Sequence, residues 1–177
     1  MFDIRTAASA ADYERFAALV AEYTGWCRAR YADDSWVVEA AFSQQSLEDE
    51  LRSLPGVYGR PNGQTFLAFD GDGAVMGACA YRRLSDEVCE LKRLFVPQRF
   101  QGSGLGRALA QTALSAAATD GYRWMRLDTV KRMTEAIALY RSLGFRDCAP
   151  FHRYTDRLMA SILFMERDLG EPAEGRA

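Results

Sequence analysis

Near its centre the chain places an apolar, strand-like run, a glycine-rich turn and a helical run in direct succession. The turn covers residues 102–107, with the sequence Gly-Ser-Gly-Leu-Gly-Arg, and helical periodicity follows from about Gly104 to Thr119. Glycine permits a positive φ and lets a ligand approach the backbone closely. The first turn of a helix carries N–H groups without a helical partner and a partial positive charge. The segment therefore predicts a cradle for an anion such as a pyrophosphate.

Two common phosphate-binding patterns do not fit this turn. A P-loop requires Lys followed by Ser or Thr after its last glycine, and here Arg107 follows Gly106. The dinucleotide pattern G-x-G-x-x-G requires its third glycine where Arg107 stands. A domain that binds a nucleotide through one of these two patterns is therefore the weakest of the hypotheses open to this sequence.

Length and composition limit the remaining classes. The 177 residues, 49% of them hydrophobic, predict a single domain over residues 1–169 and a flexible tail over 170–177. A formal charge of −2 disfavours a generic nucleic-acid partner, and no apolar run approaches a membrane span or a signal segment. Four scattered cysteines and one histidine disfavour a metal site. We expect a cytoplasmic protein without metal, nucleic-acid or membrane partners, for which a homodimer is the commonest assembly.

Periodicity and turn residues predict a mixed order of helices and strands. Asp70 to Gly73 form a strong hairpin signal. Two further helical regions, at about residues 10–24 and 33–54, are expected before it, the second ending ahead of Pro55-Gly56. A later helix is expected over 134–145, with Thr134 as its N-cap. The expected strands are 1–5, 64–70, 74–84, 88–96, 122–130, 145–151 and 160–169.

This order fits a mixed sheet with helices on both faces. Within the strand at 88–96, simple alternation divides the side chains between two faces. One face is expected to carry Glu90, Lys92, Leu94 and Val96, and the other Leu91, Arg93 and Phe95.

Two segments together resemble the GCN5-related N-acetyltransferase (GNAT) family. The spacing Gln101-x-x-Gly104-x-Gly106 resembles that family's coenzyme A pyrophosphate loop, and "LDTVKRMTEAIALYRSLGF" resembles its fifth strand and the helix after it. The resemblance implies an α+β (mixed α/β) fold. Its GNAT-type central sheet would be mixed and mostly antiparallel, splayed between the fourth and fifth strands, with helices on both faces.

The resemblance also implies an activity and a co-substrate. Members pass an acetyl or other acyl group from acetyl-CoA directly to a primary amine in a ternary complex, without a metal. The acceptor, a small-molecule amine or a protein amine, is not implied. The residues implied to bind the co-substrate are Leu94, Phe95 and Val96 through their main chain, and Gln101, Gly102, Ser103, Gly104, Leu105, Gly106 and Arg107.

By its position in the family motif, Tyr140 is implied to be a general acid for the leaving thiolate. Glu90 is the candidate base for the amine, and an ion pair with Lys92 is an equally weighted structural role. Asp128 is left outside the catalytic set, as a residue that orients an amine or completes a hydrogen-bond network.

Two residues depart from the family pattern, and the roles of several others remain open. Gln101 stands where the family commonly has Arg, and Met133 where it often has an Asn that contacts the cofactor. Basic residues near the turn are expected to form a solvated rim, some reaching the cofactor's 3′-phosphate: Arg82, Arg83, Lys92, Arg93 and Arg99. Aromatic residues of the early helices either shape an acceptor pocket or belong to the core: Trp26, Tyr31, Trp36 and Phe42. A non-catalytic acyl-CoA-binding sensor module is the alternative to an enzyme.

Overall fold

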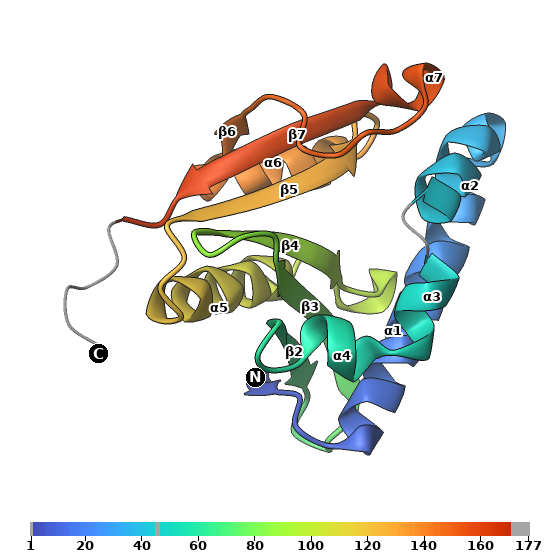
Figure 1. Ribbon diagram of the computed structural model, residues 1–177. Helices are drawn as coiled ribbons and strands as arrows, with labels where there is room; N and C mark the ends of the chain where they lie inside the picture. Colours follow the sequence, from blue (N-terminus) through green and yellow to red (C-terminus); the bar gives the residue numbers. More distant parts are fainter. Residues whose placement is uncertain (1, 45–46, 171–177) are drawn as a thin grey trace.

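In the part of the chain that the structure describes, the apolar runs form one sheet of seven strands with helices on both faces (Figure 1). The computed structural model describes residues 2–44 and 47–170. The strands are β1 (Asp3–Thr6), β2 (Gly63–Phe69), β3 (Val75–Arg83), β4 (Val88–Phe95), β5 (Trp124–Val130), β6 (Arg146–Asp147) and β7 (Ile162–Asp168). The helices are α1 (Ala10–Arg30), α2 (Ser35–Gln44), α3 (Leu47–Arg52), α4 (Leu54–Tyr58), α5 (Leu105–Thr119), α6 (Thr134–Ser142) and α7 (Asp156–Met159), with short 3₁₀ turns at Ala32–Asp34 and Gln98–Phe100.

The strand order is β1-β2-β3-β4-β5-β7-β6, and β4 with β5 is the parallel pair in an otherwise antiparallel sheet. This pair is short. Among the described residues its register runs only from Val88 opposite Trp124 to Glu90 opposite Arg126. Figure 1 shows the two strands diverging from that end toward α1 and α2. The expected fold, splayed between its fourth and fifth strands, is confirmed.

Strand β4 does not alternate as expected, because it contains a bulge. Lys92 lies opposite Ala80 and Phe95 opposite Ala78, so three steps on β4 match two on β3. Arg93 takes a positive φ of 56° at this point. Leu91, Leu94 and Val96 consequently pack on the α5 side, whereas Phe95 packs with α1 and α4. The prediction that Leu91 and Phe95 share a face was wrong.

The hairpin prediction is confirmed. Strands β2 and β3 pair antiparallel, and the side chain of Asp70 accepts hydrogen bonds from the N–H groups of Asp72 and Ala74 at 3.0 and 2.8 Å. A short polar side chain that bonds to its own turn stabilises the reversal of the chain. The hairpin thereby places β3 beside β2, and β3 pairs on its other edge with β4.

Helix boundaries differ from the predictions in two places. Helix α1 starts as expected, with a capping box between Ser9 and Asp12, but it continues to Arg30 instead of ending at Thr24. Its last turns are held by Cys27, which packs against α2. The region 33–54 does not end ahead of Pro55, because that proline lies in the first turn of α4, where its missing N–H is not needed.

Smaller corrections concern the second half. Thr134 is the first residue of α6 rather than its N-cap, and its hydroxyl donates to Glu135 at 3.1 Å. The expected strand at 145–151 is reduced to the two residues of β6, and the short helix α7 was not expected. The predicted tail lies outside the described residues beyond Gly170. Within the described part of the chain, no helix is both long and apolar enough to cross a membrane.

Candidate functional site

The glycine-rich turn lies where the sequence predicted it, between β4 and α5. Gly102 and Gly104 have φ values of 77° and 82°, a conformation that L side chains rarely adopt. Gly104 is the N-cap of α5, and the first helical hydrogen bond runs from the N–H of Ala108 to its carbonyl at 3.1 Å. The N–H groups of residues 105–107 thus precede the hydrogen-bonded part of α5. Leu105, 1% exposed, anchors this end of the helix in the core.

Side chains of the turn hold the loop itself. The Gln101 amide donates to the carbonyl of Val96 at 2.9 Å, and the Ser103 hydroxyl donates to the carbonyl of Phe100 at 2.7 Å. Arg107 reaches α6, where its guanidinium donates to the hydroxyl of Ser142 at 2.8 Å. These side-chain hydrogen bonds stabilise the conformation of the turn, and the N–H groups of residues 105–107 remain available to a ligand.

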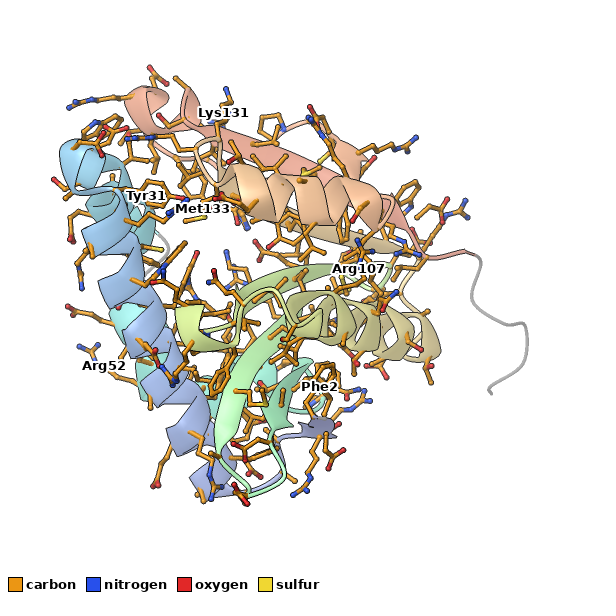
Figure 2. All side chains as sticks on the ribbon, turned by 180° about the vertical axis from the view of Figure 1, so that it is seen from behind. Phe2, Tyr31, Arg52, Arg107, Lys131 and Met133 are labelled. Carbon is orange, nitrogen blue, oxygen red and sulfur yellow. The ribbon has the colours of Figure 1, made fainter. Side chains whose placement is uncertain are left out.

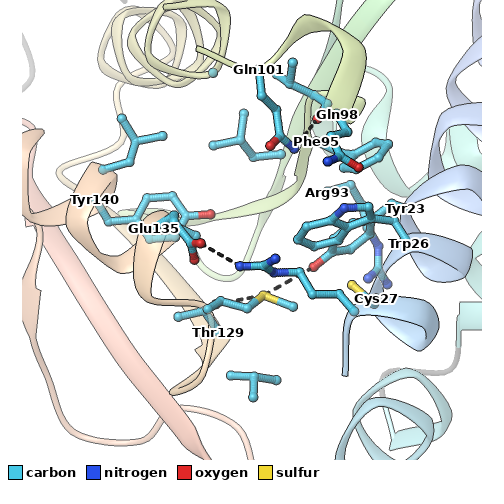
Figure 3. Close-up of a pocket in the computed structure, with 18 of the residues that line it drawn as sticks. Tyr23, Trp26, Cys27, Arg93, Phe95, Gln98, Gln101, Thr129, Glu135 and Tyr140 are labelled. Carbon is cyan, nitrogen blue, oxygen red and sulfur yellow. Dashed lines mark hydrogen bonds and ion pairs between the residues drawn. The ribbon is translucent and has the colours of Figure 1, made fainter. Parts of the chain in front are cut away.

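A cavity of about 880 Å³ begins at this turn and lies between the diverging strands (Figure 3). Figure 3 shows Tyr140 and Glu135 on one wall, with Trp26 and Phe95 on the opposite one. Among the residues predicted to bind a co-substrate, Ser103 alone is not part of the lining. The lining includes Leu94, Phe95, Val96, Gln101, Gly102, Gly104, Leu105, Gly106 and Arg107.

Tyr140 comes from α6 and is buried, with its hydroxyl directed into the cavity (Figure 3). Its ring rests edge-on against Phe145, with 5.8 Å between ring centroids. Burial raises the pKa of Tyr140 well above its usual range, because the phenolate would be poorly solvated. The side chain therefore keeps its proton at neutral pH.

Glu90 is fully buried and does not line the cavity. His152 and Lys92 lie 2.8 and 3.3 Å from its Oε1, and Arg82 donates to Oε2 at 2.7 Å. Burial alone would raise the pKa of Glu90, but Lys92, His152 and Arg82 together hold it well below its usual range. Both oxygens of the carboxylate therefore contact charged or polar partners within the protein rather than the cavity.

Lys92 joins the two diverging strands. Its Nζ lies 3.1 Å from Oδ1 of Asp128 on β5, and both side chains are almost fully buried. The other Asp128 oxygen accepts a hydrogen bond from the Tyr154 hydroxyl at 2.6 Å. Unlike Glu90, both Lys92 and Asp128 line the cavity. A carboxylate that the sequence interpretation left aside is thus placed at the site.

The basic rim expected from the sequence is not a uniform solvated surface. Lys92 and Arg93 are buried, 6% and 8% exposed, and Arg93 forms a two-pronged ion pair with Glu50 at 2.7 and 3.0 Å. The more exposed Arg83 and Arg99 pair with Asp86 and Glu22.

An aromatic wall lies across the cavity from Tyr140 (Figure 3). We use this name for Tyr23, Trp26, Tyr31, Phe42 and Phe95, all of which line the cavity. The centroid of the Phe95 ring lies 5.2 Å from that of Tyr23 and 6.2 Å from that of Trp26. Trp36, the fourth aromatic residue suggested by the sequence, is outside the lining and lies under the guanidinium of Arg157.

Three lining residues connect the aromatic wall to α6: Met133, which the sequence marked as a departure from the family pattern, and Arg30 and Glu135, which sequence reasoning missed. The Met133 sulfur lies 3.8 Å from the Tyr23 hydroxyl, and Figure 2 shows Met133 near Tyr31 at this end of the molecule. Arg30, at the end of α1, forms an ion pair with Glu135 at 2.7 Å. The separation of 105 residues between these two partners explains why no local pattern indicated the contact.

Comparisons with known proteins identify the family of the chain and agree with its fold. A family model described as the acetyltransferase (GNAT) family matches residues 23–145, well over half of the chain. An uncharacterized N-acetyltransferase of Schizosaccharomyces pombe is 33% identical over 109 residues, which are 61% of this chain and 67% of that protein. Human N-acetylaspartate synthetase is 32% identical over 115 residues, 64% of this chain but only 38% of the synthetase. An acetyltransferase structure from Streptococcus agalactiae aligns with a TM-score of 0.73 and 18% identity, over 94% of this chain and 98% of that one, and supports the fold.

Proposed function

The chain belongs to the acetyltransferase (GNAT) family, and from that premise we propose that it transfers an acetyl group from acetyl-CoA to a primary amine by direct attack in a ternary complex. One observation carries the proposal. A single cavity joins the glycine-rich turn, Tyr140 and the aromatic wall, so that two reactants can meet inside it.

The turn fits the pyrophosphate of the co-substrate. A Cβ built at Gly102 or Gly104 would meet no other described heavy atom within 4 Å, so the space outside these glycines is open. The N–H groups of residues 105–107 carry the positive end of the α5 dipole, which favours an anion. Arg107 adds a positive charge next to them. We propose that these groups, together with residues 101–104, hold the phosphates.

Strand β4 would orient the rest of the co-substrate. Past Glu90 the described pairing with β5 ends, and Leu94, Phe95 and Val96 line the cavity there, so the β5 side of this segment is open to a partner. Bound acetyl-CoA would supply the activated acetyl thioester and its leaving sulfur. A backbone N–H of this segment would stabilise negative charge on the carbonyl oxygen during transfer.

Two side chains would move protons. Tyr140 keeps its hydroxyl proton at neutral pH and would donate it to the departing sulfur. An amine with a pKa near 10.4 is uncharged in only about one molecule in 10³ at pH 7, so a base must accept its proton. Asp128 lines the cavity whereas Glu90 does not, and we therefore assign this acceptance to Asp128, directly or through water. Glu90 would hold Lys92 in position beside Asp128 through its ion pair with Lys92.

Direct attack fits better than a covalent acetyl-enzyme. Cys27 is the cysteine that lines the cavity. Burial raises the pKa of its thiol to about 11, so almost none of it is the nucleophilic thiolate at pH 7. Mass spectrometry after incubation with acetyl-CoA alone should find no acetyl group on Cys27.

Release of free thiol from acetyl-CoA, measured with a panel of primary amines and amino acids, tests the proposal. We expect amine-dependent release from the native chain, and a loss of about 10²-fold in kcat for Tyr140→Phe with little change in acetyl-CoA affinity. Binding of acetyl-CoA with no release of free thiol in the presence of any acceptor would favour the sensor module. The space between Tyr140 and the aromatic wall, which an acceptor could occupy, supports the enzyme instead.

A further inference from the structure

The cationic side chains of the cavity differ in how firmly their partners hold them. Among the described residues, those that line it are Arg30, Lys92, Arg93 and Arg107. Lys92 lies between two buried carboxylates, and Arg93 is held by both oxygens of Glu50 in a pair that is 4% exposed on each side. Arg107 belongs to the turn that we assign to the phosphates. Each of these three side chains therefore already has a buried partner or a proposed role.

Arg30 is different, because its partner is exposed. Its guanidinium lies 2.7 Å from one oxygen of Glu135, and the two side chains are 45% and 70% exposed (dashed line in Figure 3). Exposed ion pairs contribute little to stability and exchange readily. Another carboxylate of suitable position can therefore replace Glu135 without a large loss of stability.

The position of the Arg30 guanidinium does not depend on Glu135 alone. It lies 5.6 Å from the ring centroid of Trp26 and 5.9 Å from that of Tyr31, at the aromatic wall. A guanidinium held in this way keeps its donors directed at a ligand, and its planar fork matches the two oxygens of a carboxylate. The geometry is that of a pre-positioned anion contact.

We propose that Arg30 binds the carboxylate of the acceptor, and that the acceptor is an amino acid rather than a simple amine. The carboxylate of the substrate would take the place of the Glu135 carboxylate, and the aromatic wall would contact the apolar part of the molecule. This inference rests on the proposed acetyl transfer, since it names the acceptor class for the same site.

The test compares amino acids with the amines that lack their carboxylate. Suitable pairs are L-alanine with ethylamine, L-leucine with 3-methylbutylamine, and L-phenylalanine with 2-phenylethylamine. For at least one pair we expect kcat/KM to be about 10-fold or more higher for the acid. Arg30→Met should lower kcat/KM for that acid by about 10- to 100-fold, because a charged hydrogen-bond pair is lost. The same substitution should change kcat/KM for the matched amine by less than about 3-fold. Arg30→Lys, which keeps the charge without the fork, should restore part of the loss.

Arg132 provides a matched control. It lies over the Tyr31 ring at 5.5 Å and pairs with Asp33 and Asp34 at 3.0 and 3.2 Å, but it is outside the lining of the cavity. Arg132→Met should leave the preference for the acid unchanged. The inference is overturned if amines react as well as the acids, if Arg30→Met lowers both equally, or if Arg132→Met reproduces its effect.

A binding measurement separates this inference from the proposed reaction. Calorimetry of the same amino acids with the protein saturated by coenzyme A needs no turnover. If no acceptor is acetylated but Arg30→Met alone weakens amino-acid binding, the proposed function fails and the carboxylate contact stands. Equal binding by the native chain and Arg30→Met overturns the contact, whether or not acetyl transfer is observed.

Discussion

The two ends of the cavity are built from different parts of the chain. At the glycine-rich end the lining includes one short stretch of the chain, residues 100–102 and 104–107, in which three glycines carry no side chain. At the aromatic end the lining comes from α1, α2, β4 and the start of α6, and the groups are side chains. A site made of backbone depends on local conformation, whereas a site made of side chains depends on which distant helices pack together. This difference is why we propose the first end for the co-substrate and the second for the acceptor.

Asp128, which lines the cavity beside Lys92, is the position at which a substitution should lower activity most. Asp128→Asn should lower kcat by about 10²- to 10⁴-fold, because the amide cannot accept the proton of the amine. Glu90→Gln should lower kcat much less, since Glu90 is outside the cavity lining. Steady-state kinetics at saturating acetyl-CoA, with thermal unfolding to compare folding, measures both. A larger loss for Glu90→Gln would return the role of base to Glu90 and contradict our assignment.

A smaller effect is expected at the backbone-built end. Gly104→Asn retains a residue that tolerates positive φ but adds a side chain to the open space of the cradle. We expect its Kd for acetyl-CoA, measured by calorimetry, to rise about 10-fold, with little effect on acceptor preference. Gly121→Asn is the matched control, since Gly121 has a φ of 90° and open space at the other end of α5. Similar affinities for the two variants would mean that the turn does not hold the phosphates.

The smallest effect concerns stability in acid. The pKa of Glu90 is lower in the folded chain than its ordinary value of 4.5, so its ionic contacts stabilise the fold fully above that pH. Their contribution declines as the pH falls toward the folded value. Glu90→Gln should therefore be less stable than the native chain at pH 7, and the difference should shrink below about pH 4. Urea unfolding across this range measures it, and a difference that stays constant with pH would argue against the buried network.

Local signals allowed the sequence to predict the backbone-built end. The glycines, the periodicity of α5 and the hairpin at Asp70 each depend on residues a few positions apart, and the structure contains all three. The bulge in β4 could not be predicted in this way. It accompanies a positive φ at Arg93, whose side chain pairs with Glu50, 43 residues away.

The aromatic wall and its arginine depend on still longer separations. Phe95 of β4 meets Tyr23 and Trp26 of α1 only after the sheet and the helices have assembled. The sequence indicated aromatic residues but could not tell lining from core, so Trp36 was grouped with residues that line the cavity. Asp128 was undervalued for a similar reason, because its place beside Lys92 results from the parallel pairing of β4 with β5.

Amide signals of ¹⁵N-labelled protein, followed during titration with coenzyme A, report on whether the glycine-rich turn binds the phosphates. We expect the signals of Gly102, Gly104 and Gly106 to change most among the glycines, since we propose that their main chain contacts the phosphates, and those of Gly73 and Gly121 to stay in place. Binding that leaves the signals of residues 102–107 unmoved, or no binding at all, would contradict this expectation.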